Sequence, residues 1–138
     1  MVRLAEIKDA EQLYSLNEAF NGKCDVSIKS IEKSITENSQ ELIIVDDENG
    51  KLTGFVCVQI KKSFCYPDCS AELTEVFVLP EFRKKGKASR MIIFAEEYCH
   101  NNYLISGFEL LTGDDNLAAQ SVYSKLGYAD DGELHMSK

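Results

Sequence analysis

Residues 71–89 constrain the fold of this chain more than any other stretch, because they join a buried strand to a helix through a cationic turn. The apolar run at 76–79 has the β-branched and aromatic bias of a buried strand. Pro80 ends the strand, since proline has no N–H to donate within a sheet. Apolar residues recur at helical spacing after Gly86, which puts this glycine at or just before a helix N-terminus. Free N–H groups and the helix dipole favour an anion there.

Positive charge is concentrated on the same turn, although the chain as a whole carries a net charge of −8. A local positive island at a helix N-terminus suits a phosphate or a pyrophosphate. The alternative is a solvated turn in which glycine only permits tight geometry. For the short pattern R-x-x-G-x-A taken alone, that alternative is favoured. The cations concerned are Arg83, Lys84, Lys85, Lys87 and Arg90.

A second strand, turn and helix follows at residues 108–127. The apolar segment 108–112 predicts a short strand, and Asp115 or Asn116 is a suitable N-cap for the helix after it. The apolar stripe of this helix includes Tyr123, and Gly127 ends the helix.

Together the two stretches resemble the GNAT superfamily of N-acetyltransferases. Its members typically show V-x-P-x-[FY]-[RQ]-x-x-G-x-[GA] on a strand, turn and helix, and N-x-x-A-x-x-x-Y-x-x-x-G-[FY] on the next helix. Each pattern is weak alone, but both occur here in order and at the expected separation, within residues 71–128. Residues 78–88 match the first pattern, and the second is matched by Asn116, Ala119, Tyr123, Gly127 and Tyr128.

Two positions depart from the family pattern. Lys87 occupies a position that is usually apolar, and we expect its side chain to point to solvent or to reach a phosphate. Ala88 stands where glycine is most frequent, and a methyl group in the first helical turn should be tolerated. Neither departure removes the resemblance.

The rest of the chain is compatible with one domain, residues 1–138, of the α/β GNAT fold, a mixed and mainly antiparallel central sheet with helices on both faces. Asp9 with Gln12 predicts a capping box at the first helix, and Ser27 caps the second. Asp131-Gly132 predicts a small terminal hairpin; beside it, the sheet edge is either left exposed or covered by a second copy, as in a homodimer. The remaining predicted elements are strands at 2–6, 41–45 and 52–60, with an Asn-Gly turn at 49–50.

Composition excludes several classes of protein. Apolar residues make up 44% and charged residues 28%, as in soluble globular proteins, and no apolar run is long enough to span a membrane. The N-terminus lacks the apolar segment of an export signal, so we expect a cytoplasmic protein with reduced thiols. Cys65 and Cys69 lack a second Cys/His pair at zinc spacing, so we expect no metal site. The acidic balance argues against nucleic acid as a partner.

The resemblance implies acetyl-CoA as co-substrate. The backbone of Val76, Phe77 and Val78 would bind the pantetheine arm, and Asn116 would hydrogen-bond the same arm. Tyr123 would protonate the departing thiolate. Tyr123 also fits a plain core position, and Asn116 also fits a helix cap. The pyrophosphate would lie on the backbone of Arg83, Lys84, Lys85, Gly86, Lys87, Ala88 and Ser89.

The residue that deprotonates the attacking amine is the least determined part of the site. Glu72 and Glu75 are the acidic residues on the central strand, and they point to opposite faces if the strand is regular. A bulge would alter that alternation. We favour Glu75 as the base, with Glu72 second; a surface role for either carboxylate, or a water chain, remains an alternative.

The acceptor is expected to be a small amine with positive charge, because the chain is acidic, with a pI near 4.8. The end of the chain also resembles the aminoglycoside 3-N-acetyltransferases, in which paired acidic residues face the antibiotic. By that resemblance Asp114 and Asp115 would contact the acceptor; otherwise they are only acids at a helix N-terminus. An alternative function is a non-catalytic acyl-CoA-binding sensor or partner domain of the same fold.

Overall fold

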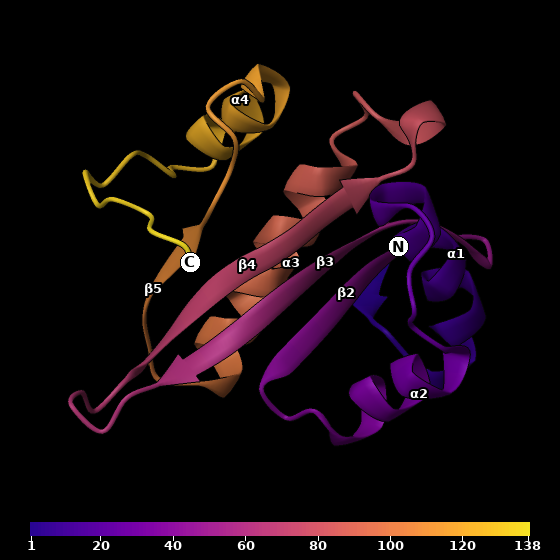
Figure 1. Ribbon diagram of the computed structural model, residues 1–138, viewed down its shortest axis with the longest axis horizontal. Helices are drawn as coiled ribbons and strands as arrows, with labels where there is room; N and C mark the ends of the chain where they lie inside the picture. The colour runs from indigo at the N-terminus through magenta and orange to yellow at the C-terminus, as the bar shows by residue number, and fades with distance from the viewer.

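The computed structural model describes residues 1–138 and has a five-stranded sheet at its centre, in the strand order β1-β2-β3-β4-β5 (Figure 1). The first four strands pair antiparallel, and only β4 and β5 pair parallel. A parallel pair needs a crossover, which a helix after β4 provides. The strands are β1 Val2–Leu4, β2 Glu41–Glu48, β3 Lys51–Lys62, β4 Cys69–Val78 and β5 Ile105–Leu110.

Helices cover both faces of this sheet, as expected from the sequence (Figure 1). The crossover helix α3 packs on one face, where Met91 and Ile92 are fully buried against β2 and β3. On the other face Leu13 and Leu16 of α1 pack against Phe55 and neighbouring strand residues. The helices are α1 Ala10–Asn21, α2 Ile28–Glu37, α3 Lys87–Asn102 and α4 Leu117–Lys125, with 3-10 turns at Ile7–Asp9 and Pro80–Phe82. None of the helices is both long and apolar enough to cross a bilayer.

Most local predictions are confirmed. Ser27 caps α2, accepting a hydrogen bond from the Ser30 N–H at 3.1 Å. Asn49 and Gly50 both have positive φ and turn β2 into β3. Strand β4 ends at Val78, two residues before Pro80, and Gly86 is the N-cap of α3.

Three local predictions are wrong. The capping box of Asp9 and Gln12 is absent, because the Asp9 carboxylate accepts hydrogen bonds from Arg3 and from the Glu6 N–H, while Gln12 bonds to the β2–β3 turn. Strand β5 starts at Ile105 rather than Phe108, since its parallel register with β4 begins there. No terminal hairpin forms around Asp131-Gly132, where N–H groups bond to aspartate side chains instead of a second strand.

The parallel pairing of β4 and β5 ends early, and this creates the opening in the sheet. The last paired residues are Leu73 of β4 and Leu110 of β5. Directly after Leu73, the register of β3 and β4 shifts, so that Thr74 is an extra, bulged residue. The second half of β4 therefore keeps only β3 as a neighbour. Its other edge is free.

Candidate active site

The free edge of β4 offers backbone hydrogen-bonding groups to a ligand. The Leu79 N–H donates to the Thr53 carbonyl of β3, at 2.9 Å. Because alternate residues point their backbone groups to opposite edges, Phe77 also faces β3. A Cβ placed on Gly54 of β3 would lie 2.5 Å from the Phe77 carbonyl oxygen, which agrees with this assignment. Val76 and Val78 thus face the opening, whereas Phe77 does not.

We expected the backbone of Val76, Phe77 and Val78 to bind the pantetheine arm, but Phe77 is turned away from the opening. The backbone groups of Phe77 are directed at β3, and its side chain is buried against α1 and Phe20. The Val78 carbonyl already accepts a hydrogen bond from Nε of Arg83 at 2.8 Å. The groups left for a ligand are the N–H and carbonyl of Val76 and the N–H of Val78.

The turn at the end of β4 has an unusual backbone. Lys84 and Gly86 both adopt left-handed conformations, with φ of 62° and 75°. Gly86 is the N-cap of α3, so the first N–H groups of the helix point toward the turn without helical partners. Alternating left- and right-handed residues direct successive N–H groups into one concavity, which is a geometry that binds anions. The residues present therefore fit a pyrophosphate through their backbone.

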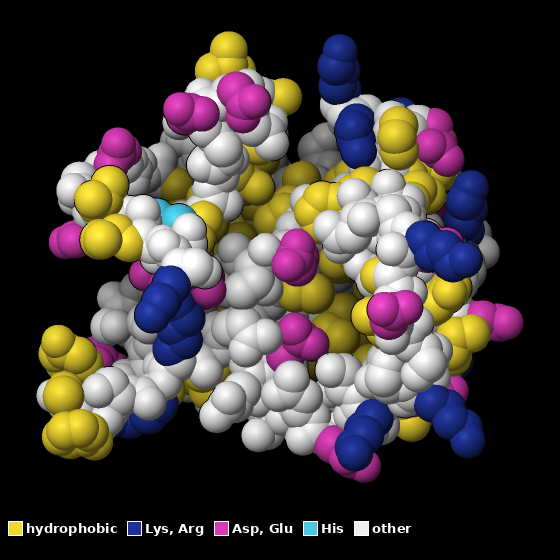
Figure 2. Space-filling model, viewed as in Figure 1, with side chains coloured by type: hydrophobic (Ala, Val, Ile, Leu, Met, Phe, Trp, Pro, Cys, Tyr) yellow, Lys and Arg dark blue, Asp and Glu magenta, His cyan; other side chains and the backbone are white.

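Two cations of this turn donate hydrogen bonds to backbone carbonyls of the protein. Arg83 bonds to Val78, and Nη1 of Arg90 donates to the Lys85 carbonyl at 3.0 Å. Lys84 and Lys85 are exposed, and they remain as the side chains available to a phosphate. Figure 2 shows basic side chains on one side of a hollow whose floor is hydrophobic.

The position of Lys87 contradicts the expectation that its side chain points to solvent, since the side chain is buried and bonds to a carboxylate of β2. It is 8% exposed, and its Nζ lies 2.5 Å from Oδ2 of Asp46 on β2. Asp46 also accepts a hydrogen bond from the buried hydroxyl of Thr53. Burial alone would raise the pKa of Asp46, but the bonds from Lys87 and Thr53 outweigh it and hold the pKa below its ordinary value.

Helix α4 carries the predicted acid. Asn116 is its N-cap, and the side-chain oxygen accepts a hydrogen bond from the Ala119 N–H at 3.2 Å. The amide nitrogen of Asn116 stays available for a ligand. Tyr123 packs against the same core cluster as Val76, and burial raises the pKa of its hydroxyl. A phenol with a raised pKa stays protonated, as a proton donor must.

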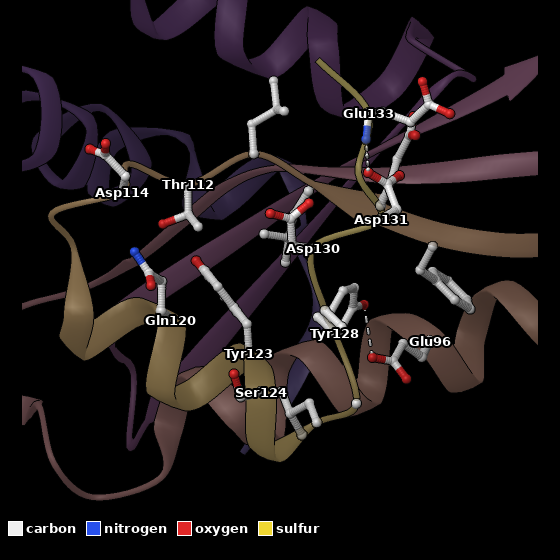
Figure 3. A pocket seen from close by; sticks show the side chains of 17 residues that line it. Glu96, Thr112, Asp114, Gln120, Tyr123, Ser124, Tyr128, Asp130, Asp131 and Glu133 are labelled. Carbon is white, nitrogen blue, oxygen red and sulfur yellow. Dashed lines mark hydrogen bonds between the residues drawn. The ribbon is translucent and has the colours of Figure 1, made fainter. Parts of the chain in front are cut away.

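A cavity of about 880 Å³ lies between β5, α4 and the C-terminal segment (Figure 3). Tyr123, Thr112 and Asp130 line it, and the Tyr123 hydroxyl points into it in Figure 3. Asp114 belongs to the lining, whereas Asp115 does not. Both aspartates are exposed, and an added Cβ on Gly113 would touch the Asp115 carboxylate. Of these two aspartates, Asp114 is therefore the better placed to contact a molecule in the cavity.

The bulge at Thr74 brings Glu72 and Glu75 to the same face of the sheet. Glu75 pairs with Cys57 of β3, and Glu72 pairs with Gln59. Cys57 and Gln59 are two residues apart and share a face, so their partners share it as well. This is the face of α1 and α2. The alternation of a regular strand would have separated the two carboxylates.

The two carboxylates have different environments. Glu72 forms an ion pair with Lys61 at 3.3 Å, whereas no ion pair joins Glu75 to a cation. Burial raises the pKa of Glu75, and a carboxylate with a raised pKa accepts a proton more readily. Burial, together with the charges of Glu41 and Glu75, raises the pKa of the Cys57 thiol far above its usual range. Cys57 therefore stays protonated and is unsuited to be a nucleophile.

Sequence reasoning missed two features of this site. Glu41 lies near Glu75, and burial and the Glu75 charge raise its pKa. The signal available for Glu41 was its cross-strand partner Gln59, to which it is hydrogen-bonded at 3.0 Å, but this pairing requires the β2–β3 register. The acidic lining of the cavity, including Glu96 of α3, depends on how the chain end folds back. No sequence pattern reports that arrangement.

Comparison with known proteins identifies the family of this chain. Residues 7–128 match the model of the acetyltransferase (GNAT) family. An uncharacterized N-acetyltransferase of Bacillus subtilis (strain 168), YhfO, is 31% identical over 111 residues, which cover 75% of this chain and 69% of that protein.

Solved structures share the fold over the whole chain. The structure of AAC(6')-Iy with a bisubstrate analogue, CoA-S-monomethyl-acetylneamine, has a TM-score of 0.87 at 20% identity and covers 100% of this chain and 96% of its own. A ribosomal-protein-alanine N-acetyltransferase from Brucella melitensis biovar Abortus 2308 has a TM-score of 0.83 at 15% identity and covers 100% and 99%. At these identities the likeness concerns the fold. The family match, the relative and the fold together show that this chain belongs to the GNAT family and is an N-acetyltransferase.

Proposed function

We propose that the chain transfers an acetyl group from acetyl-CoA to a primary amine of a small, cationic acceptor. One observation carries this proposal: the free edge of β4 is followed by a turn with left-handed residues at Lys84 and Gly86, and this turn ends at the N-terminus of α3. An amide-rich arm and a pyrophosphate, joined in that order, match these two surfaces. Acetyl-CoA is the acetyl donor of the family.

In this proposal the donor is held mainly by backbone groups. Val76 and the Val78 N–H bind the pantetheine arm as an added strand would. The Arg83 N–H already donates to the Pro80 carbonyl, so the N–H groups of residues 84–89 bind the pyrophosphate, with help from the exposed ammonium groups of Lys84 and Lys85. The Asn116 amide binds the arm from the α4 side. Recognition through the backbone explains why Ala88 is acceptable at a position where glycine is frequent.

The proposed reaction is direct attack. Glu75, or a water molecule bound to it, removes a proton from the acceptor ammonium group. The amine nitrogen then forms a bond to the carbonyl carbon of the thioester, and the carbon–sulfur bond breaks. Tyr123 gives its proton to the departing thiolate, and the second proton of the attacking nitrogen, lost as the amide forms, restores the Tyr123 hydroxyl directly or through water. Cys57 takes no part, since its raised pKa keeps the thiol protonated.

The acceptor is proposed to be cationic because acidic groups lie on the two surfaces that it could contact. Glu75 and Glu41 lie on the sheet face of α1 and α2, and Asp114 lines the cavity beside Tyr123. Figure 2 shows acidic side chains on the sheet face below the hollow. Aminoglycosides and polyamines have the charge that these groups favour. Asp115 remains a second, weaker candidate for an acceptor contact.

The test is acetyl-CoA binding by calorimetry, followed by thiol release with a panel of amines. The panel contains polyamines, aminoglycosides, free amino acids and neutral amines of similar size. Binding with release on the cationic amines is the expected result. Binding without release on any amine would favour the sensor function instead. Absence of acetyl-CoA binding would overturn the proposal.

A further inference from the structure

Lys87 and Asp46 form a buried ion pair that connects the cationic turn to β2, a strand two places away from β4 in the sheet. Lys87 is the first residue of α3, directly after Gly86, and Asp46 is on β2. Their exposed fractions are 8% and 3%. Two strands, β3 and β4, separate β2 from the opening at β5. The side chain of Lys87 therefore runs away from the place proposed for the pyrophosphate.

A lysine at this position is unfavourable without its partner. A cation in the first turn of a helix opposes the helix dipole, and a buried ammonium loses its hydration. Asp46 and the more exposed Glu48 compensate, at 2.5 and 3.4 Å from Nζ. The hydroxyl of Thr53, which is fully buried, fixes the Asp46 carboxylate from β3. The pair thus holds the start of α3 against β2 and β3 at a defined distance.

The turn needs such a support, because its backbone is strained. Lys84 adopts a left-handed conformation that costs a residue with a Cβ about 1 kcal/mol. The turn is held by Arg83 at its start, by Arg90 over the Lys85 carbonyl and by Lys87 at its end. The contact of Lys87 reaches β2, 41 positions away in the chain, and Nζ of Lys51 on β3 lies 5.0 Å from the ring centroid of Phe82.

We propose that the buried pair of Lys87 and Asp46 positions the N–H groups of residues 84–89 for the pyrophosphate of CoA, without Lys87 touching a phosphate. This inference rests on the proposed donor site. It assigns Lys87 and Asp46 as positioning residues. It predicts that loss of either partner weakens the affinity for the nucleotide half of CoA and leaves the chemical step intact.

The variants are Lys87→Met, Asp46→Asn and the double variant, with Asp9→Asn as the matched control. Asp9 is also a buried carboxylate, 2% exposed and paired with Arg3, but it has no contact with the turn. Each single variant at the pair should raise KM for acetyl-CoA about tenfold, as loss of an orienting group typically does. The double variant should be no worse than either single one. Unfolding midpoints are measured for all variants, and Asp9→Asn should lower Tm comparably without a change in KM.

A second donor separates positioning from a general loss of structure. Acetyl-pantetheine contains the arm and the thioester but no pyrophosphate. Wild type and the variants at the pair should use it with the same kcat/KM, and kcat with acetyl-CoA should stay within about twofold of wild type. Lys87→Arg, which keeps the charge, should restore part of the acetyl-CoA affinity.

The outcomes are distinct. If wild type does not bind CoA, both the donor site and this inference are wrong. If wild type binds CoA and Asp46→Asn binds it equally well or more tightly, the donor site stands and the positioning role is wrong. Tighter binding by Asp46→Asn, combined with weaker binding by Lys87→Met, would mean that Lys87 contacts the phosphate directly. Equal losses with acetyl-CoA and acetyl-pantetheine would reduce the pair to a structural role.

Discussion

The N-terminus of α3 and the N-terminus of α4 present opposite charges and are held in opposite ways. The turn before α3 exposes Lys84 and Lys85, and the turn before α4 exposes Asp114 and Asp115. The first turn is fixed by long-range contacts, above all the buried bond from Lys87 to β2. The second has short-range bonds only, such as those from the Asn116 N–H and the Gln120 side chain to the Gly113 carbonyl.

We assign the turn before α3 to the acetyl donor and the turn before α4 to the acceptor amine. The family uses acetyl-CoA as its donor, and a turn fixed by the core suits a shared ligand. The acceptor varies between members, and a turn held by its own residues can change sequence without disturbing the core. The comparison predicts that substitutions at α3 alter use of acetyl-CoA, whereas substitutions at the start of α4 alter use of the amine.

Tyr123→Phe should give the largest effect and would show that α4 also contributes to chemistry. Loss of the hydroxyl removes the proton donor for the thiolate, so kcat should fall about 100-fold, with KM for acetyl-CoA nearly unchanged. Steady-state kinetics on the preferred amine measure this. Tyr103→Phe is the matched control, because Tyr103 packs against the same core cluster and burial raises its pKa as well. A kcat loss shared by both variants would contradict the acid role.

Glu75→Gln should lower kcat/KM for the amine by roughly 30-fold, since a base is lost but water can replace it in part. The pH profile is more specific. Burial raises the pKa of Glu75, and the base works only when deprotonated. The activity of wild type should therefore decline as pH falls through a pKa above the ordinary carboxyl range. In the variant this limb should disappear.

Glu72→Gln is the comparison for that experiment. Glu72 is on the same face but is paired with Lys61, and its loss should have a smaller effect and leave the acidic limb in place. If Glu72→Gln removes the limb and Glu75→Gln does not, the roles of the two carboxylates are exchanged. If neither does, the proton leaves through water.

Gly86→Ala should raise KM for acetyl-CoA about tenfold and lower the free energy of unfolding by about 1 kcal/mol. The left-handed backbone resists a side chain, and the new Cβ would lie 3.2 Å from Nη1 of Arg90, which supports the turn. Gly50→Ala is the control, because Gly50 has φ of 89° and nothing within 4 Å of an added Cβ. It should lose similar stability, measured by denaturant unfolding, with unchanged KM. Unchanged KM in Gly86→Ala would separate the turn from donor binding.

Features with local causes could be predicted from the sequence. Gly86 as a cap, the Asn49-Gly50 turn and Asn116 as a cap each depend on residues within one turn of chain, and all three are confirmed. The order of strands and helices gave the fold class for the same reason, with the family resemblance fixing the arrangement.

Features caused by contacts between distant segments could not be predicted. Lys87 has a cationic side chain in a cationic turn, and nothing near it in sequence indicates burial against Asp46. Glu72 and Glu75 share a face only because β3 and β4 slip by one residue at Thr74, and the register of a neighbouring strand is needed to see it. The sequence alone leaves open whether Glu72 and Glu75 share a face, because that depends on whether a bulge forms between them.

Asp114→Ala should give the smallest effect, and it tests the α4 side of the comparison directly. An exposed carboxylate contributes little to binding, so KM for a cationic acceptor should rise only about threefold, while KM for acetyl-CoA stays constant. Asp115→Ala should change the acceptor KM less, because Asp114 lines the cavity and Asp115 does not. Repeating the kinetics at high salt should shrink the difference between wild type and Asp114→Ala, since salt screens exposed charges. Equal acceptor KM values for wild type and both variants, at low salt, would remove the acidic turn from the acceptor site and leave Glu75 and Glu41 as the groups that favour a cation.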